Sequence, residues 1–278
     1  DIDLKINKLI GKLLKKSEKK IFKNLLIKHF RDIIKKDHLG SINYNLRLVN
    51  ILKKKQEDIN FNSNISQLIK DCIKYGTVPF SILARHAFIS KSILNSLQNL
   101  RIISNTDVNK FYSNISSIAT DFVLDVNKLK IGKISRKKFN LLYGHLRPGT
   151  YDILSKRYDE TNYINFSNIQ NIKIRNASDD IFSKDQRNKI NKLLNKFQID
   201  LSARELINYM KDSFSYREYA KFIFSKNVSE ILKIIKKEAL KRKLKINDIP
   251  YLELKNFNNK ISRNNLSKIK NKIIINKR

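Results

Sequence analysis

The run from Gly144 to Asp152 gathers side chains that can bind an anion or move a proton. The guanidinium of Arg147 matches the geometry of a phosphate or carboxylate, and the imidazole of His145 can exchange a proton near neutral pH. Glycine and proline in the same run restrict the backbone to a shaped loop. We therefore expect His145, Arg147 and Asp152 to be catalytic, with Arg147 binding an anionic group.

The side chains on either side of this run are candidates for substrate binding. The predicted contacts in and after the loop are Thr150, Tyr151, Arg157 and Tyr158. The alternative for this region is purely structural: Asp152 and Arg147 form an internal ion pair that fixes the loop, and His145 caps a helix.

A second candidate segment covers residues 75–89. Gly76 and Pro79 predict a tight turn into a helix, whose free N–H groups would attract an anion. Thr77, Arg85 and His86 complete the predicted substrate-binding set. The structural alternative is that Arg85 pairs with an acid and that His86 is a satisfied core or rim histidine.

Several other kinds of site are not visible in the sequence. It has no glycine-rich phosphate loop, no HExxH and no Cys/His set with metal spacing, so we predict no metal and no cofactor in this chain. Zinc fingers and RNP aromatic motifs are also missing.

Residues 75–89 and 144–153 resemble the central region of phosphoenolpyruvate-synthase-like phosphotransferases. The similarity is greatest to members from polysaccharide gene clusters, which include an L-glutamine kinase of capsular phosphoramidate synthesis. Residues 217–222 and 247–252 resemble the helix and connector that precede the phosphohistidine domain in this family. The resemblance is specific over residues 64–160, weaker over 202–254, and only generally helical over 1–60.

The resemblance implies a mechanism and a set of partners. An ATP-grasp domain, with ATP and Mg²⁺, phosphorylates a histidine on a mobile domain, which delivers the phosphoryl group to a small-molecule acceptor such as L-glutamine. The signature Thr-Ser-His of the mobile domain is not in this sequence. The chain begins at Asp1 and has Met210 as its only methionine, so we expect a catalytically incomplete excerpt of a cytoplasmic enzyme.

Composition leaves two further interpretations open. The formal net charge is +33, from 58 Lys and Arg against 25 Asp and Glu, which favours a polyanion partner such as nucleic acid. Most of these cations are lysines spread along a chain rich in Asn and Ile, so we expect a solvated surface and regard nucleic-acid binding as the less favoured alternative. The other interpretation is that the chain is a structural spacer between catalytic domains. No apolar run is long enough for a membrane span.

The elements that must position these residues are predicted to be mainly α-helical. Apolar residues recur at three-and-four spacing along most of the chain, and residues 165–176 alternate weakly enough to allow a short β-hairpin. Capping boxes are predicted at Ser202–Glu205 and Ser215–Glu218, the second opening a long helix. We divide the chain into an acceptor-binding domain (1–200), a long-helix connector (201–256) and a frayed or truncated tail (257–278). The single cysteine, Cys72, is expected to be buried.

Overall fold

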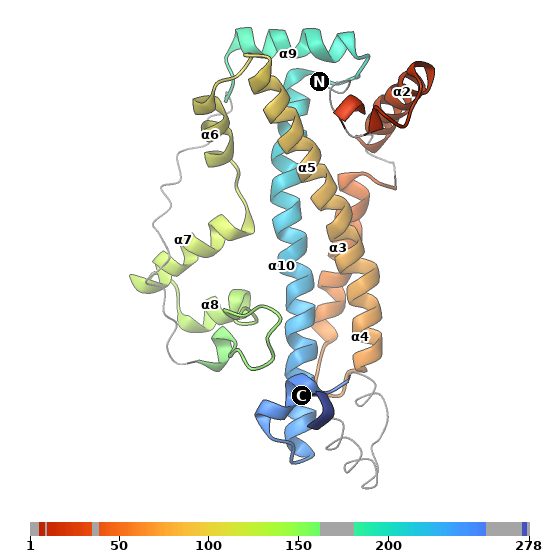
Figure 1. Ribbon diagram of the computed structural model, residues 1–278. Helices are drawn as coiled ribbons and strands as arrows, with labels where there is room; N and C mark the ends of the chain where they lie inside the picture. Colours follow the sequence, from red (N-terminus) through yellow and green to blue (C-terminus); the bar gives the residue numbers. More distant parts are fainter. Residues whose placement is uncertain (1–5, 9, 35–38, 162–180, 254–273, 277–278) are drawn as a thin grey trace. The chain divides into compact units, whose positions relative to one another are not determined.

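The computed structural model describes residues 6–8, 10–34, 39–161, 181–253 and 274–276, and in these ranges the chain is helical with no strand. Figure 1 shows the longer helices. The α-helices are α2 (Lys16–Ile33), α3 (Ile42–Lys55), α4 (Ile65–Cys72), α5 (Val78–Asn99), α6 (Asn105–Ser113), α7 (Ile118–Lys130), α8 (Arg136–Tyr143), α9 (Lys184–Lys196) and α10 (Ala203–Lys241). The predicted mainly α class is confirmed, while the hairpin predicted at 165–176 lies outside the described residues.

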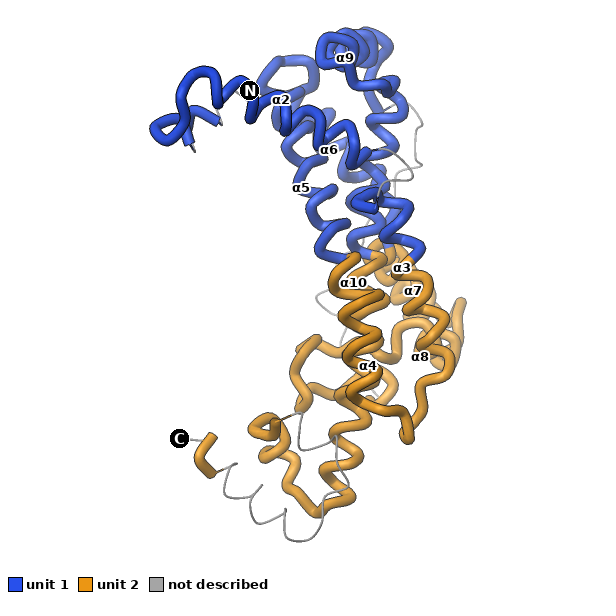
Figure 2. Tube along the Cα trace, turned by 90° about the vertical axis from the view of Figure 1, so that its right-hand side faces the viewer, with its two compact units in different colours: residues 1–47, 80–117, 173–218 blue, residues 48–79, 118–172, 219–278 orange. Residues whose placement is uncertain are grey.

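Two compact units divide the chain, each built from three stretches of sequence, and Figure 2 colours them separately. Unit 1 contains residues 1–47, 80–117 and 173–218, and unit 2 contains residues 48–79, 118–172 and 219–278. The N-terminal part of α10 therefore belongs to unit 1 and its C-terminal part to unit 2. The boundary predicted at residue 200 concerns functional regions and stays a prediction.

Unit 1 has an apolar core formed by residues from α5, α6, α9 and α10. Phe111, Phe182 and Met210 are fully buried in it, and the Phe111 and Phe182 rings stack at 6.4 Å. Rings and branched aliphatic side chains of this kind supply most of the hydrophobic stabilisation of a domain.

Among the described residues of unit 2, two apolar clusters position the 144–161 loop. The first cluster joins α4 to the end of α10 and includes Ile153 of the loop. The second cluster is aromatic and is centred on Phe139 and Tyr143 of α8, with Phe222 of α10 and Tyr158 packed against it. Both sides of the loop are thus attached to buried apolar residues.

Side-chain caps begin several of the helices. Ser202 and Glu205 form the predicted reciprocal capping box, with both backbone N–H groups bound. The box predicted at Ser215 is wrong, because α10 is already helical from Ala203 onward. The Ser215 hydroxyl instead donates to the carbonyl of Ser116 at 2.7 Å.

The segment around Gly76 and Pro79 is helical throughout, which corrects the prediction of a tight turn. Residues Ile73–Thr77 form a π-helical turn between α4 and α5, and the Val78 N–H donates to the carbonyl of Ile73. Proline has no N–H, and in a regular α-helix its ring would clash with the carbonyl four residues before it. The wider π turn accommodates Pro79 without ending the helix. The predicted free helix N-terminus is therefore absent from this segment.

Candidate functional site

The 144–161 loop follows α8 in unit 2 and closes on itself through its backbone. The Tyr158 N–H donates to the carbonyl of Leu146 at 2.8 Å, and the Asp159 N–H donates to that of Gly144 at 3.1 Å. These bonds bring the two ends of the loop together, as expected for a compact surface loop packed by its own groups. The predicted shaped loop is therefore present.

Arg147 lies inside this loop and is only 8% exposed. Its Nη1 donates to the carbonyls of Asp152 at 3.1 Å and Ser155 at 3.2 Å, and its Nη2 donates to Ser229 Oγ at 3.0 Å. The Ser229 hydroxyl in turn donates to the carbonyl of His145 at 2.6 Å. The proposed Arg147–Asp152 ion pair is wrong, since the arginine binds the backbone oxygen of Asp152. Both terminal nitrogens are thus engaged within the protein.

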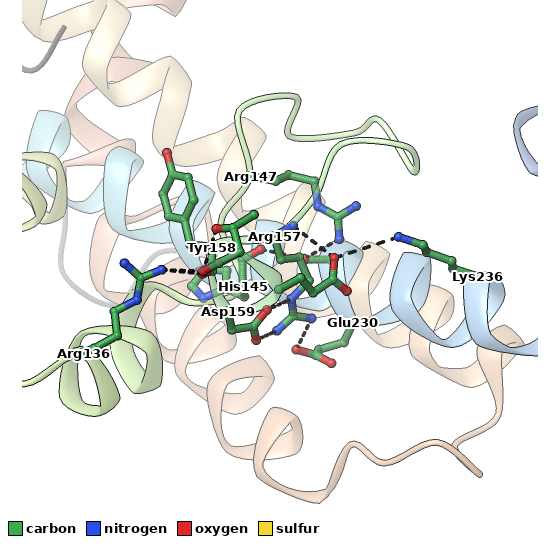
Figure 3. A network of polar contacts seen from close by, with 11 residues as sticks. Arg136, His145, Arg147, Arg157, Tyr158, Asp159, Glu230 and Lys236 are labelled. Carbon is green, nitrogen blue, oxygen red and sulfur yellow. Dashed lines mark hydrogen bonds and ion pairs between the residues drawn. The ribbon is translucent and has the colours of Figure 1, made fainter. Parts of the chain in front are cut away.

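Arg157 is the second buried arginine, 3% exposed, and it connects the loop to α10. Its Nε and Nη2 bind the two carboxylate oxygens of Asp159 at 2.9 and 2.7 Å, and its Nη1 binds Glu230 at 2.7 Å (Figure 3). Burial alone would lower the pKa of Arg157, but the hydrogen bonds and charges of Asp159 and Glu230 outweigh it and raise the pKa. The two carboxylates compensate this cation, so it has no free charge for a phosphate.

His145 is buried at 4% exposure, with its ring edge-on to Phe222 at 4.8 Å between centroids. Burial, and then the charges of Lys226 and Arg157, lower the pKa of His145 to about 3. Its Nε2 has no hydrogen-bond partner in the part of the chain that the structure describes. The imidazole is therefore neutral at physiological pH and a weak proton acceptor, which argues against general-base catalysis.

Asp152 and Tyr151 occupy the outer part of the loop and are exposed. They line a pocket of about 250 Å³ together with Ile153, Leu232, Ile235, Ile249, Pro250 and Leu252. The carboxylate of Asp152 accepts from the Leu154 N–H at 2.9 Å through Oδ1, which orients it. This pocket contains two of the predicted site residues.

Gly149 has a packing role in the loop. A Cβ at this position would lie 3.0 Å from the Cβ of Asp152 and 3.3 Å from that of Ser155. The Gly149 N–H also donates to Ser155 Oγ at 3.1 Å. Because Gly149 has no side chain, the turn can close with the side chains of Asp152 and Ser155 next to it.

Thr150 and Tyr158, two more predicted substrate contacts, have different places in the loop. Tyr158 is half-buried against the aromatic cluster: its ring stacks on Phe122 at 6.2 Å, and burial raises the pKa of its hydroxyl. Thr150 is half-buried in the turn beside Gly149 and does not line the pocket.

The residues predicted from the 75–89 segment are not in the loop. Arg85 and His86 belong to unit 1, and Thr77 is half-buried in the π turn of unit 2. His86 is buried, with Nε2 2.7 Å from the carbonyl of Gly40 and Nδ1 2.8 Å from the Tyr209 hydroxyl. Since a carbonyl only accepts, Nε2 carries the proton and Nδ1 accepts from the tyrosine. His86 is thus a satisfied core histidine, as the structural alternative predicts.

Several residues that hold the loop were not identified from the sequence. Arg136 of α8 donates to the carbonyls of Tyr158 at 3.0 Å and Thr161 at 2.8 Å, and Ser229 and Glu230 act from α10. The one sequence signal is that Ser229 is a small polar residue on the apolar side of a helix. Such a residue is buried only with a hydrogen-bond partner, but the sequence does not reveal which one.

Comparisons with known proteins do not place the chain in a family. No family model, curated protein or solved structure matches it significantly. Among the described residues, no group of three or more His, Cys, Asp or Glu is arranged to hold a metal ion. None of the described helices combines the length and the apolar character needed to cross a bilayer.

Proposed function

We propose that this chain supplies the helical acceptor-side region of an ATP-dependent phosphotransferase that works through a mobile phosphohistidine domain. The class comes from the resemblance of residues 75–89 and 144–153. The structural observation that supports it is the 144–161 loop, whose two buried arginines fix it to α10 beside a pocket of about 250 Å³. Binding residues are commonly presented on loops held by a rigid scaffold.

In this proposal the loop residues have different roles from those that their residue types alone suggest. Asp152 and Tyr151 are the acceptor-binding residues, because they are exposed and line the pocket. Arg147 and Arg157 act as positioning residues: they hold the loop and face protein groups. In this proposal the charge of the phosphoryl group is neutralised mainly by residues of the ATP-grasp and phosphohistidine domains.

A structural spacer is the second candidate, and a specific observation favours it. The cations that seemed suited to an anion, Arg147 and Arg157, are both committed to internal hydrogen bonds. If the pocket binds nothing, the whole loop serves only to join α8 to α10. The nucleic-acid alternative depends on the net charge of +33 alone.

The decisive experiment uses the complete gene product that contains this chain. With ATP labelled at the γ-phosphate, we expect label first on a histidine and then on a small acceptor such as L-glutamine. Asp152→Asn should lower transfer to the acceptor and leave histidine labelling unchanged. The control is Asp121→Asn, which removes an exposed carboxylate of α7 that does not line the pocket.

Two results would contradict the proposal. A gene product that forms no phosphohistidine with ATP is not a phosphotransferase of this class. Full acceptor turnover by a folded Asp152→Asn variant would remove the pocket from the site and favour the spacer.

A further inference from the structure

The pocket in unit 2 is lined by one acidic residue and no basic one among the described residues, although basic residues predominate in the whole chain. Of the eight described residues that line it, six are apolar, one is the phenol Tyr151, and the charged one is Asp152. The chain as a whole has more than twice as many cations as anions, 58 against 25. An anionic group therefore lies in this pocket of a strongly cationic protein.

The carboxylate has unused hydrogen-bonding capacity. Its Oδ1 accepts from the Leu154 N–H, and in the described part of the chain no donor is bound to Oδ2. The nearby guanidinium of Arg147 is bonded to the backbone oxygen of Asp152 and not to the carboxylate. An ionised carboxylate only accepts hydrogen bonds, so a ligand that satisfies it must bring a donor.

The position of this carboxylate is fixed by the loop and does not depend on a ligand. Arg147 holds the carbonyl of Asp152, and the lack of a Cβ at Gly149 leaves room for its side chain. Ile153, the next residue, is buried in the apolar cluster that joins α4 to α10. The carboxylate of Asp152 is thus held in advance at the edge of the pocket, which reduces the ordering cost of binding.

From these observations we infer that the pocket binds a small molecule with a nitrogen donor, an ammonium or amide group, on a short apolar stem. The nitrogen binds Asp152, and the stem packs on the side chains of Leu232, Ile235 and Ile249. The inference rests on the proposed function only in identifying this molecule as the phosphoryl acceptor. It excludes an acceptor whose main polar group is a carboxylate placed at Asp152, because the two negative charges repel.

The test uses three probes of nearly equal size and different charge: n-butylammonium, butyramide and butyrate. Binding to the chain is followed by ¹H–¹⁵N NMR shifts of the pocket residues. We expect affinity to fall in that order, and Asp152→Asn to weaken butylammonium binding about fivefold, the upper end for an exposed ion pair. Asp121→Asn changes the net charge equally and should leave all three affinities unchanged.

The results of this test either support or overturn the inferred nitrogen-donor ligand. Butylammonium binding that depends on Asp152 supports the inference. Equal affinity for the three probes, a preference for butyrate, or no shift with any probe would overturn it. The proposed function fails separately: a gene product that forms no phosphohistidine leaves the binding site intact, while transfer to an acceptor bound through its carboxylate rejects only the inference.

Discussion

Two regions of unit 2 contain glycine and proline a few residues apart, and they fold in opposite ways. Around Gly76 and Pro79 the chain stays helical and adopts only one π turn. Between Gly144 and Gly149 the helix ends and a long loop begins. Glycine and proline thus occur within a continuous helical segment at residues 76–79 and in a loop that lines a pocket at residues 144–149.

The difference comes from what each region contacts. Gly76 faces Phe224 of α10 and Leu52 of α3, and a Cβ there would lie 2.8 and 2.9 Å from their side-chain atoms. This glycine therefore permits close helix packing and is not needed for a turn. The carbonyls of Gly144 and Leu146 instead bind backbone N–H groups of the returning chain. Glycine and proline mark a point where the backbone departs from a regular helix, but the tertiary partners decide its form.

The largest expected effect is that of Arg157→Met, which removes the buried cation of the loop and keeps a similar side-chain volume. We expect the free energy of unfolding to fall by about 3 kcal/mol, because Asp159 and Glu230 lose their common partner. Urea denaturation measures the change. An effect below about 0.5 kcal/mol, the size typical of a surface substitution, would show that the loop is not held by this network.

Local sequence patterns predict only part of the fold and of the loop contacts. The helical class and the Ser202 capping box follow from local periodicity and spacing, and both are confirmed. The partners of Arg147 and Arg157 cannot be predicted from local patterns, because Ser229 and Glu230 lie more than 70 residues further along the chain. Local patterns identify a polar side chain but not whether distant residues will use its hydrogen bonds. In the folded chain Arg147 and Arg157, expected from the sequence to bind an anion, bind protein groups and hold the loop.

Gly76→Ala is expected to have the second largest effect, about 2 kcal/mol of destabilisation, since the added methyl group meets the Cβ of Phe224 in a packed helix interface. Gly149→Ala is the matched change in the loop. Its nearest contacts, to Asp152 and Ser155, are longer at 3.0 and 3.3 Å, so we expect about 1 kcal/mol there. Thermal unfolding compares the two variants. The reverse order would mean that the loop, and not the helical segment, is the tightly packed region.

His145 should make the protein sensitive to acid. Its pKa is lowered from 6.5 to about 3 in the folded state, so between these values the unfolded chain binds the additional proton. Stability therefore falls as the pH drops below about 6.5, with a maximal slope of about 1.4 kcal/mol per pH unit from this group. His145→Gln should show a shallower decline in urea denaturation between pH 6.5 and pH 5. Because His86 is retained in both proteins, equal slopes would mean that His145 is not buried as a neutral group.

The smallest expected effect is that of Arg85→Met in α5, the helix that continues from the segment around Gly76 and Pro79. Arg85 is exposed on α5, and no partner is bound to it among the described residues, so the free energy of unfolding should change by less than about 0.5 kcal/mol. The substitution is chemically the same as Arg157→Met, which makes the pair a direct measure of what burial and pairing contribute. Acceptor turnover by the complete gene product adds a second readout. A folded Arg85→Met variant that loses turnover would mean that α5 takes part in the chemistry, and the division between structural helices and a functional loop would no longer hold.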